Sequence, residues 1–179
     1  MAATIVAAVQ IGCGPVASTA TQDHAGASTT PGAVVGLCGP DEPGDRLEFG
    51  GRVLDMRGRP LAKAAVVAYH ADRRGLYNPR SSETRVPRLR GVAVTGDLGR
   101  FQFSTVRPGA YPEGAEPVHV HVAVLAPAHH VRHLDYWFEG DPLITDRRRS
   151  SRNSNTIIVA LARKDGAWTF QHDIRLEGN

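Results

Sequence analysis

The sequence lacks the features that mark several common classes of protein. It contains only 2 cysteines, Cys13 and Cys38. These could pair in an oxidising compartment, but Cys13 would be lost with a cleaved leader, so the cysteines do not identify the compartment. No segment shows a long 3.6-residue hydrophobic period, no internal repeat is visible, and no apolar run is long enough to span a bilayer. A long helix, a repeat array and a membrane span are therefore not expected.

The charge pattern gives no sign of a nucleic-acid partner. The formal net charge is only +3, and the arginines are scattered through the chain apart from one cluster, which comprises Arg147, Arg148, Arg149 and Arg152. This cluster lies beside Ser and Asn without interleaved aromatic residues. A solvated loop is therefore favoured over a nucleic-acid surface.

The first 44 residues differ in composition from the rest of the chain. The stretch "MAATIVAAVQIGCGPVASTA" has a short apolar core and small residues, and resembles an export leader, although its start carries no positive charge. Cys13 could then be a lipid-attachment cysteine, with Gln10 an unusual residue three positions before it. The polar stretch "TQDHAGASTTPGAVVG" follows. We expect residues 1–44 to be an export leader and a flexible linker; the alternatives are a disordered tail on a cytoplasmic protein or a misplaced start codon.

From residue 45 the sequence has the pattern of an all-β domain. Short alternating or apolar runs are separated by turns such as "MRGRP", "GDLG" and "RPGAYP". The runs expected to form strands are "RLEFGGRVLD", "AKAAVVAYHA", "GVAVT", "RFQFSTV", "VHVHVAVLA", "NTIIVALAR" and "WTFQHDIRL". With no crossover helices between them, they predict one antiparallel β-sandwich domain over residues 45–179.

This strand pattern is also found in proteins without a catalytic role. "GRVLDMRGRPLAKAAVVAY" followed by "TGDLGRFQFSTVRPGAY" resembles the transthyretin-like or carboxypeptidase-regulatory sandwich modules. Such modules are usually structural or interaction domains and need no metal. A metal-free interaction module is therefore one alternative to an enzyme.

Two histidines in one apolar strand are the first indication of a metal site. In "PGAYPEGAEPVHVHV", His119 and His121 point to the same face of a strand, because successive side chains alternate between faces. A His-x-His pair alone is more often packed or solvent-exposed than metal-bound. Two tyrosines in separate turns, Tyr77 in "YHADRRGLYNP" and Tyr111 in "RPGAYP", supply further candidate ligands.

Together these segments resemble the intradiol ring-cleavage dioxygenases, which include protocatechuate 3,4-dioxygenase and the catechol 1,2-dioxygenases. The resemblance extends to "VVAYHADRRGLY", with Tyr69 at the family's Trp position, to "DYWFEGDPL" and to "FQHDIRL". It implies the family's β-sandwich core with long active-site loops. The family holds a non-haem Fe(III) with two tyrosines and two histidines in the order found here. By this resemblance the metal ligands are Tyr77, Tyr111, His119 and His121.

The chemistry of these side chains agrees with the implied metal. Fe(III) is a hard, highly charged cation that suits phenolate oxygen better than sulfur, whereas zinc normally takes His, Cys or carboxylate. A tyrosine with a pKa of about 10 becomes an anion at neutral pH only if the metal stabilises it. Two phenolates and a hydroxide would neutralise the ferric charge. A catecholate dianion could then replace two anions without a change in net charge.

The resemblance also implies a reaction. A catechol-type ring is cleaved between its two hydroxylated carbons with O2, which gives a muconate-type diacid. Tyr111 leaves the iron when the catechol binds and takes one of its protons, so Tyr111 is the catalytic residue. Tyr77 and His119 stay in the equatorial plane, with His121 axial. An iron-binding but catalytically altered relative is the second alternative.

Two positions depart from the family pattern. Glu116 stands where the family has an arginine three residues before the first histidine, and Asp135 stands where it often has Gln. An anion beside an anionic substrate costs roughly 4 kcal/mol for unit charges about 4 Å apart at an effective dielectric of about 20. The arginines that could supply a cation instead are Arg85, Arg88, Arg90 and Arg107. The sequence does not rank them, and it gives neither the ring substituents of the substrate nor the oligomeric state.

Overall fold

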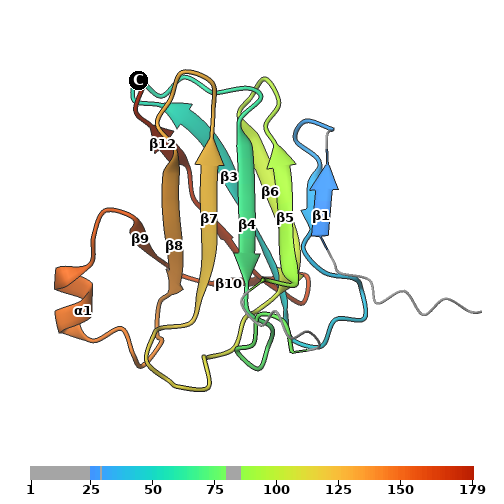
Figure 1. Ribbon diagram of the computed structural model, residues 1–179, viewed down its shortest axis with the longest axis vertical. Coiled ribbons are helices and arrows are strands. Elements are labelled where there is room, and N and C mark those ends of the chain that lie inside the picture. Colours follow the sequence, from blue (N-terminus) through green and yellow to red (C-terminus); the bar gives the residue numbers. More distant parts are fainter. Residues whose placement is uncertain (1–24, 29, 80–85) are drawn as a thin grey trace, which may run out of the picture.

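The computed structural model describes residues 25–28, 30–79 and 86–179, and its secondary structure is almost entirely β (Figure 1). The elements follow one another in the order β1 (Ala25–Ser28), β2 (Val34–Gly36), β3 (Arg46–Asp55), β4 (Ala65–His70), β5 (Leu89–Val94), β6 (Arg100–Val106), β7 (His119–Leu125), β8 (Arg132–Phe138), α1 (Asp146–Ser151), β9 (Thr156–Val159), β10 (Ala162–Lys164), β11 (Ala167–Gln171) and β12 (Ile174–Leu176).

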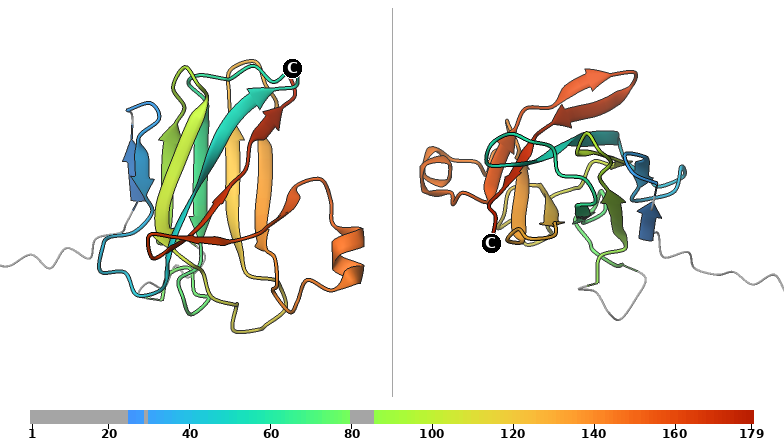
Figure 2. Two further views of the ribbon diagram at one scale, coloured as in Figure 1. Left: turned by 180° about the vertical axis from the view of Figure 1, so that it is seen from behind. Right: turned by 90° about the horizontal axis from the view of Figure 1, so that it is seen from above.

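The strands form two sheets that pack face to face (Figure 2). The first sheet has the order β1-β5-β4-β7-β8-β9, and the second has the order β10-β11-β3-β6-β2, with β12 also paired to β3. The predicted β-sandwich is confirmed. The long central strands pair antiparallel as expected, β4 with β5 and β7, β7 with β8, and β3 with β6. The shorter strands β1, β2, β9, β11 and β12 join in parallel, so both sheets are mixed.

Aromatic residues fill the space between the sheets. The ring of Phe49 on β3 lies 5.2 Å from the rings of Phe103 on β6 and Phe170 on β11. Tyr136, which comes from β8 of the first sheet, lies 5.1 Å from Phe170. Burial of each such ring contributes about 1.5–3 kcal/mol to folding. This cluster therefore joins the two sheets into one domain.

Alternation along β7 places its histidines on the outside of the sandwich. Val120, Val122 and Val124 are at most 2% exposed and point into the core. Because side chains alternate along a strand, His119 and His121 point to the outer face of the first sheet. The same-face arrangement expected from the His-x-His spacing is therefore present.

The sandwich extends further toward the N-terminus than residue 45. Val34–Gly36 forms β2, which pairs with β6, and Ala25–Ser28 pairs with β5. Val35 and Leu37 are at most 3% exposed. Part of the segment expected to be a flexible linker is thus ordered, because these two apolar side chains enter the core. The expected leader, including Cys13, lies outside the described residues.

The predicted strands differ from the observed ones in two respects. β8 was not predicted, although its Leu134, Tyr136 and Phe138 are at most 1% exposed. Each of the last two predicted runs divides into two strands, β9 and β10 in one case and β11 and β12 in the other. β11 and β12 separate because they pair with successive parts of β3, residues 47–50 and 53–55.

The arginine cluster forms a short helix rather than the expected loop. α1 begins after Thr145, whose hydroxyl accepts a hydrogen bond from the backbone N–H of Arg148. Arg149 pairs with Glu139 at 2.6 Å in a solvent-exposed contact. The expectation of a solvated surface therefore holds, whereas the expectation of a loop was wrong. No helix in the described part of the chain is long and apolar enough to cross a membrane.

Candidate metal centre

The four side chains that were predicted to bind a metal ion lie together at one end of the first sheet, which is the lower end in Figure 1. Tyr77 comes from the β4–β5 loop, Tyr111 from the β6–β7 loop, and His119 and His121 from the start of β7. Tyr77 Oη lies 2.8 Å from His121 Nε2, and Tyr111 Oη lies 3.1 Å from His119 Nε2. The two Nε2 atoms are 3.0 Å apart, and the two phenol oxygens are in hydrogen-bond contact. Four donor atoms from three segments of the chain thus surround one point.

The spacing of these donor atoms fits a single metal ion. Ligands at right angles around an ion with bonds of about 2.0–2.1 Å lie about 2.9 Å apart. Three of the four neighbouring pairs of donor atoms lie 2.8–3.1 Å apart, and the two phenol oxygens are closer. Two unprotonated imidazole nitrogens are both acceptors, so a cation between them is more favourable than their direct contact. No group of three or more His, Cys, Asp or Glu side chains among the described residues could hold an ion. The site depends on tyrosine as a ligand.

The second nitrogen of each histidine fixes the direction of its ring. His119 Nδ1 lies 2.7 Å from the carbonyl oxygen of Pro117, and His121 Nδ1 lies 2.6 Å from Asp135 Oδ1. Both contacts place the proton on Nδ1 and leave the lone pair of Nε2 directed at the tyrosines. The sequence marked Asp135 only as a departure from the family pattern. Its contact with His121 depends on the register between β7 and β8, which no local motif reveals.

Burial keeps the candidate ligands neutral in the absence of a cation. It raises the pKa of both Tyr77 and Tyr111, and the hydrogen bond with Tyr111 raises the pKa of Tyr77 further. Burial also lowers the pKa of His119. Two adjacent half-buried phenols become anions at neutral pH only if a strongly positive ion replaces their protons. A set of two phenolates and two imidazoles suits a hard ferric ion.

A row of side chains crosses the outer face of the first sheet at the level of the site. Tyr69 on β4 pairs in register with Arg90 on β5 and with His121 on β7, and His121 pairs with Asp135 on β8. The ring of Tyr69 stacks on His121, with centroids 4.6 Å apart. A cavity of about 380 Å³ is lined by Val67, Tyr69, Tyr77, Pro87 and Arg90. This cavity gives a ligand room beside Tyr77.

Backbone contacts hold the two tyrosine loops together. The N–H groups of Gly75 and Gly109 both donate to the carbonyl oxygen of Asp72, at 2.9 and 3.0 Å. Gly75 has a φ of +76° and approaches Ala110 so closely that a Cβ atom would lie 1.9 Å from the Ala110 carbonyl oxygen. The loop before Tyr77 and the loop before Tyr111 are therefore in direct backbone contact.

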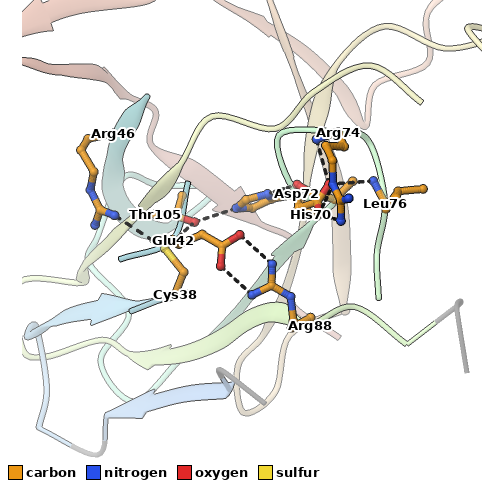
Figure 3. A network of polar contacts seen from close by, with 10 residues as sticks. Cys38, Glu42, Arg46, His70, Asp72, Arg74, Leu76, Arg88 and Thr105 are labelled. Carbon is orange, nitrogen blue, oxygen red and sulfur yellow. Dashed lines mark hydrogen bonds and ion pairs between the residues drawn. The ribbon is translucent and has the colours of Figure 1, made fainter. Parts of the chain in front are cut away.

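A buried polar network supports the loop of Tyr77, and Figure 3 shows its side chains. The backbone N–H of Arg88 donates to the Tyr77 carbonyl oxygen at 2.9 Å. The guanidinium of Arg88 makes two 2.6 Å hydrogen bonds to Glu42, and the two side chains are only 10% and 9% exposed. His70 contacts Thr105 at 2.8 Å in the same network. Because removal of one partner of a buried ion pair costs about 3–5 kcal/mol, this network holds the Tyr77 loop firmly.

The structure shows how the candidate arginines are placed relative to the site, which the sequence could not. Arg85 lies outside the described residues, and Arg88 is bound to Glu42. The guanidinium carbon of Arg107 lies 5.9 Å from the ring centroid of Trp168, which belongs to the second sheet. Of the three candidates that the structure describes, Arg90 is the one that lines the cavity beside the site.

Comparison with known proteins shows which protein family the chain belongs to. A family profile described as "Dioxygenase" matches residues 21–178. Relatives that match this chain include catechol and protocatechuate dioxygenases. The chain belongs to the intradiol ring-cleavage dioxygenase family.

Individual relatives show how far the likeness extends. The chain is 28% identical to chlorocatechol 1,2-dioxygenase of Rhodococcus opacus over 138 residues, which are 66% of this chain and 53% of that protein. It is 32% identical to catechol 1,2-dioxygenase 1 of Acinetobacter lwoffii over 126 residues, or 60% of this chain and 40% of that protein. The structure of catechol 1,2-dioxygenase from Pseudomonas arvilla C-1 matches with a TM-score of 0.67 at 25% identity, covering 81% of this chain and 56% of that one. The chain therefore spans about half the length of the curated relatives it matches.

Proposed function

We propose that the protein is a non-haem iron enzyme that cleaves a catechol-type ring between its two hydroxylated carbons. Both atoms of O2 enter the product, a ring-opened diacid. The observation that supports this most directly is the convergence of two phenol oxygens and two imidazole nitrogens on one point in a chain of the intradiol family. A β-sandwich without such a cluster would suit an interaction module equally well.

In this proposal Tyr77, Tyr111 and the two histidines of β7 hold one ferric ion. An ion held by these side chains would supply Lewis acidity to a bound catechol-type ring. The Pro117 carbonyl and the Asp135 carboxylate keep the imidazoles oriented, because each accepts the Nδ1 proton. The protein itself thus contributes a fixed set of donor atoms and, beside Tyr77, a cavity that a ligand can enter.

Tyr111 is the residue that we expect to take a proton from the substrate. The following residues, 112–116, are all exposed, so Tyr111 lies at the edge of a turn that can adjust. Tyr77 is held by the backbone hydrogen bond from Arg88, whose side chain is buried with Glu42. A proton from an incoming catechol hydroxyl can therefore pass to Tyr111 Oη while Tyr77 stays in place.

The cavity beside Tyr77 is the expected position of the substrate ring. Its walls include Val67, Pro87 and the ring of Tyr69. Apolar and aromatic walls suit a flat aromatic ring, and Tyr69 already stacks on His121, one of the candidate ligands. A ring in this cavity would present its hydroxyl edge to the four donor atoms.

Metal analysis combined with oxygen uptake tests the proposed function. We expect protein folded in iron-containing medium to hold one ferric ion per chain and to be coloured, because phenolate-to-iron charge transfer absorbs visible light. Addition of catechol should consume one O2 per ring and give a diacid. Zinc, or no metal, in correctly folded protein would contradict the proposal.

Glu116 gives a test of whether charge near the substrate limits the reaction. It is exposed, yet its negative charge adds to the main effect of burial in raising the pKa of Tyr111. We expect Glu116→Arg to raise kcat/KM for catechol by about two- to tenfold, as is typical when an exposed charge interaction is reversed. Glu113→Arg, in the same exposed turn, is the matched control. An unchanged or lower kcat/KM for Glu116→Arg alone would show that another cation already serves the substrate.

A further inference from the structure

The two candidate histidine ligands have unequal hydrogen-bond partners. His119 Nδ1 donates to the neutral carbonyl oxygen of Pro117 at 2.7 Å, whereas His121 Nδ1 donates to the carboxylate of Asp135 at 2.6 Å. A hydrogen bond to an ionised group is roughly twice as strong as one between neutral groups. Asp135 stands where the intradiol family often has Gln, so a negative charge occupies the place of a neutral amide.

The carboxylate determines which nitrogen of His121 carries the proton. An aspartate is ionised at neutral pH, and an ionised carboxylate can only accept hydrogen bonds. The side-chain amide of Asn or Gln, by contrast, can either accept a hydrogen bond or donate one. With Asp135 as the partner, Nδ1 of His121 has to donate, and the lone pair of Nε2 stays directed at Tyr77.

The sheet fixes Asp135 in this position and leaves its charge to act on His121. Asp135 lies on β8, where it pairs in register with His121 on β7 and with Thr156 on β9. Its backbone N–H donates to the carbonyl oxygen of Asn155 at 2.9 Å. Among the described residues no arginine or lysine forms an ion pair with Asp135. No basic side chain of that part of the chain therefore neutralises the carboxylate next to the imidazole.

A carboxylate in this place changes the strength of the histidine as a metal ligand. It raises the basicity of the imidazole whose proton it holds. A negative charge near the site also stabilises a ferric ion more than a ferrous ion, because the Coulomb energy is proportional to the charge. Iron held here is therefore expected to have a lower reduction potential than iron held by two histidines with neutral partners. A catechol is itself a reductant, so a centre that works in the ferric form has to resist reduction by its own substrate.

We propose that Asp135 is a positioning residue that makes His121 the stronger of the two histidine ligands and favours the ferric over the ferrous form of bound iron. This inference rests on the proposed function and specifies how this chain keeps its metal centre oxidised. Asp135 acts through His121 alone and touches neither the ion nor the substrate.

The reduction potential of Asp135→Asn tests this role, because the substitution removes the charge and keeps the size of the side chain. We expect the affinity for ferric iron to fall by about 10- to 100-fold, the loss typical of removing the partner of a metal-bound histidine. The affinity for ferrous iron should fall less, and the potential should rise by about 59 mV for each tenfold difference between the two losses. Asp135→Glu keeps the charge and should recover part of the shift. An unchanged potential in Asp135→Asn would overturn the proposal.

Glu116→Gln is the matched control for the loss of a negative charge. The charge of Glu116 also acts on Tyr111 and His119, but the hydrogen bonds described for the two imidazoles do not include this side chain. We expect a smaller rise in potential than in Asp135→Asn. An equal rise in both variants would show that any nearby carboxylate has this effect, and would overturn the specific role of the contact between Asp135 and His121.

Nitrogen NMR of the metal-free protein tests the same contact without iron. Above neutral pH we expect the proton of His121 on Nδ1 alone in the parent protein. In Asp135→Asn a second tautomer should appear, because the amide can also donate to Nδ1. A parent protein with this proton on Nε2 would overturn the proposal. If no catechol causes oxygen uptake, while the potential and the tautomer depend on Asp135 as expected, the proposed function is wrong and the role of Asp135 stands.

Discussion

Tyr77→Phe is expected to lose most of the bound iron while the fold stays intact. The substitution removes only the hydroxyl oxygen, which lies 2.8 Å from His121 Nε2 and in contact with Tyr111 Oη. In the proposed metal centre the Tyr77 phenolate stays on the ion throughout the reaction, so the variant has one metal ligand fewer. We expect iron affinity to fall by more than the roughly 10- to 100-fold typical of losing a residue that only orients a ligand. Metal analysis after dialysis against a chelator measures the loss.

Tyr111→Phe should fail in a different way. Its hydroxyl is the one that we expect to accept a substrate proton, so its loss removes an internal base and one ligand that is not needed throughout the reaction. More iron should remain than in Tyr77→Phe, whereas turnover should be slow. The visible band lost on adding catechol to the parent protein should already be absent in Tyr111→Phe.

Tyr69→Phe is the matched control for both variants. Tyr69 stacks on His121 through its ring, and the substitution keeps that ring. We expect Tyr69→Phe to retain the iron content of the parent protein. If Tyr77→Phe and Tyr111→Phe also keep parent iron content and the parent spectrum, neither tyrosine is a ligand, and the proposed metal centre is wrong.

Local sequence patterns predicted most of the sandwich because they carry the period of a strand. β3 and β6 begin and end where the runs "RLEFGGRVLD" and "RFQFSTV" do. β8 was not predicted because large residues occupy both of its faces, with Trp137 outside and Tyr136 and Phe138 inside. The alternation of apolar and polar residues that marks a strand is therefore hidden. β2 has only three residues in a stretch rich in small and polar residues, and its burial depends on pairing with β6.

The candidate site was predictable where its chemistry is local and unpredictable where it depends on strand pairing. The two-residue spacing of His119 and His121 is a local signal, and the tyrosines lie in recognisable turns. By contrast, Asp135 meets His121 and Arg90 meets Tyr69 only through the register of neighbouring strands. The sequence offered several arginines as a replacement for the family's cation, and only the sheet showed which of the described ones lies beside the cavity.

Gly75→Ala tests whether the close contact between the two tyrosine loops sets the geometry of the site. The added Cβ atom would lie 1.9 Å from the Ala110 carbonyl oxygen and 2.8 Å from Tyr111 Cα. Backbone atoms cannot yield as a flexible side chain can, so the loops must move apart. The displacement would be passed directly to Tyr111, whose hydroxyl must remain next to that of Tyr77.

We expect Gly75→Ala to lower kcat for a catechol by about 100-fold, since a misplacement of about 1 Å can cost this much. Iron content should fall as well, because the two phenol oxygens no longer meet at one point.

Gly166→Ala is the matched control. Gly166 also has a positive φ, +82° against +76° for Gly75, but no atom lies within 4 Å of its added Cβ. It should therefore show only the backbone strain of about 1–2 kcal/mol that a left-handed conformation imposes on an L-residue, visible as a lower melting temperature with normal iron content. If both variants lose stability equally and both keep iron and turnover, the tyrosine spacing does not depend on the contact at Gly75, and the support for the site must come from the buried Arg88–Glu42 pair instead.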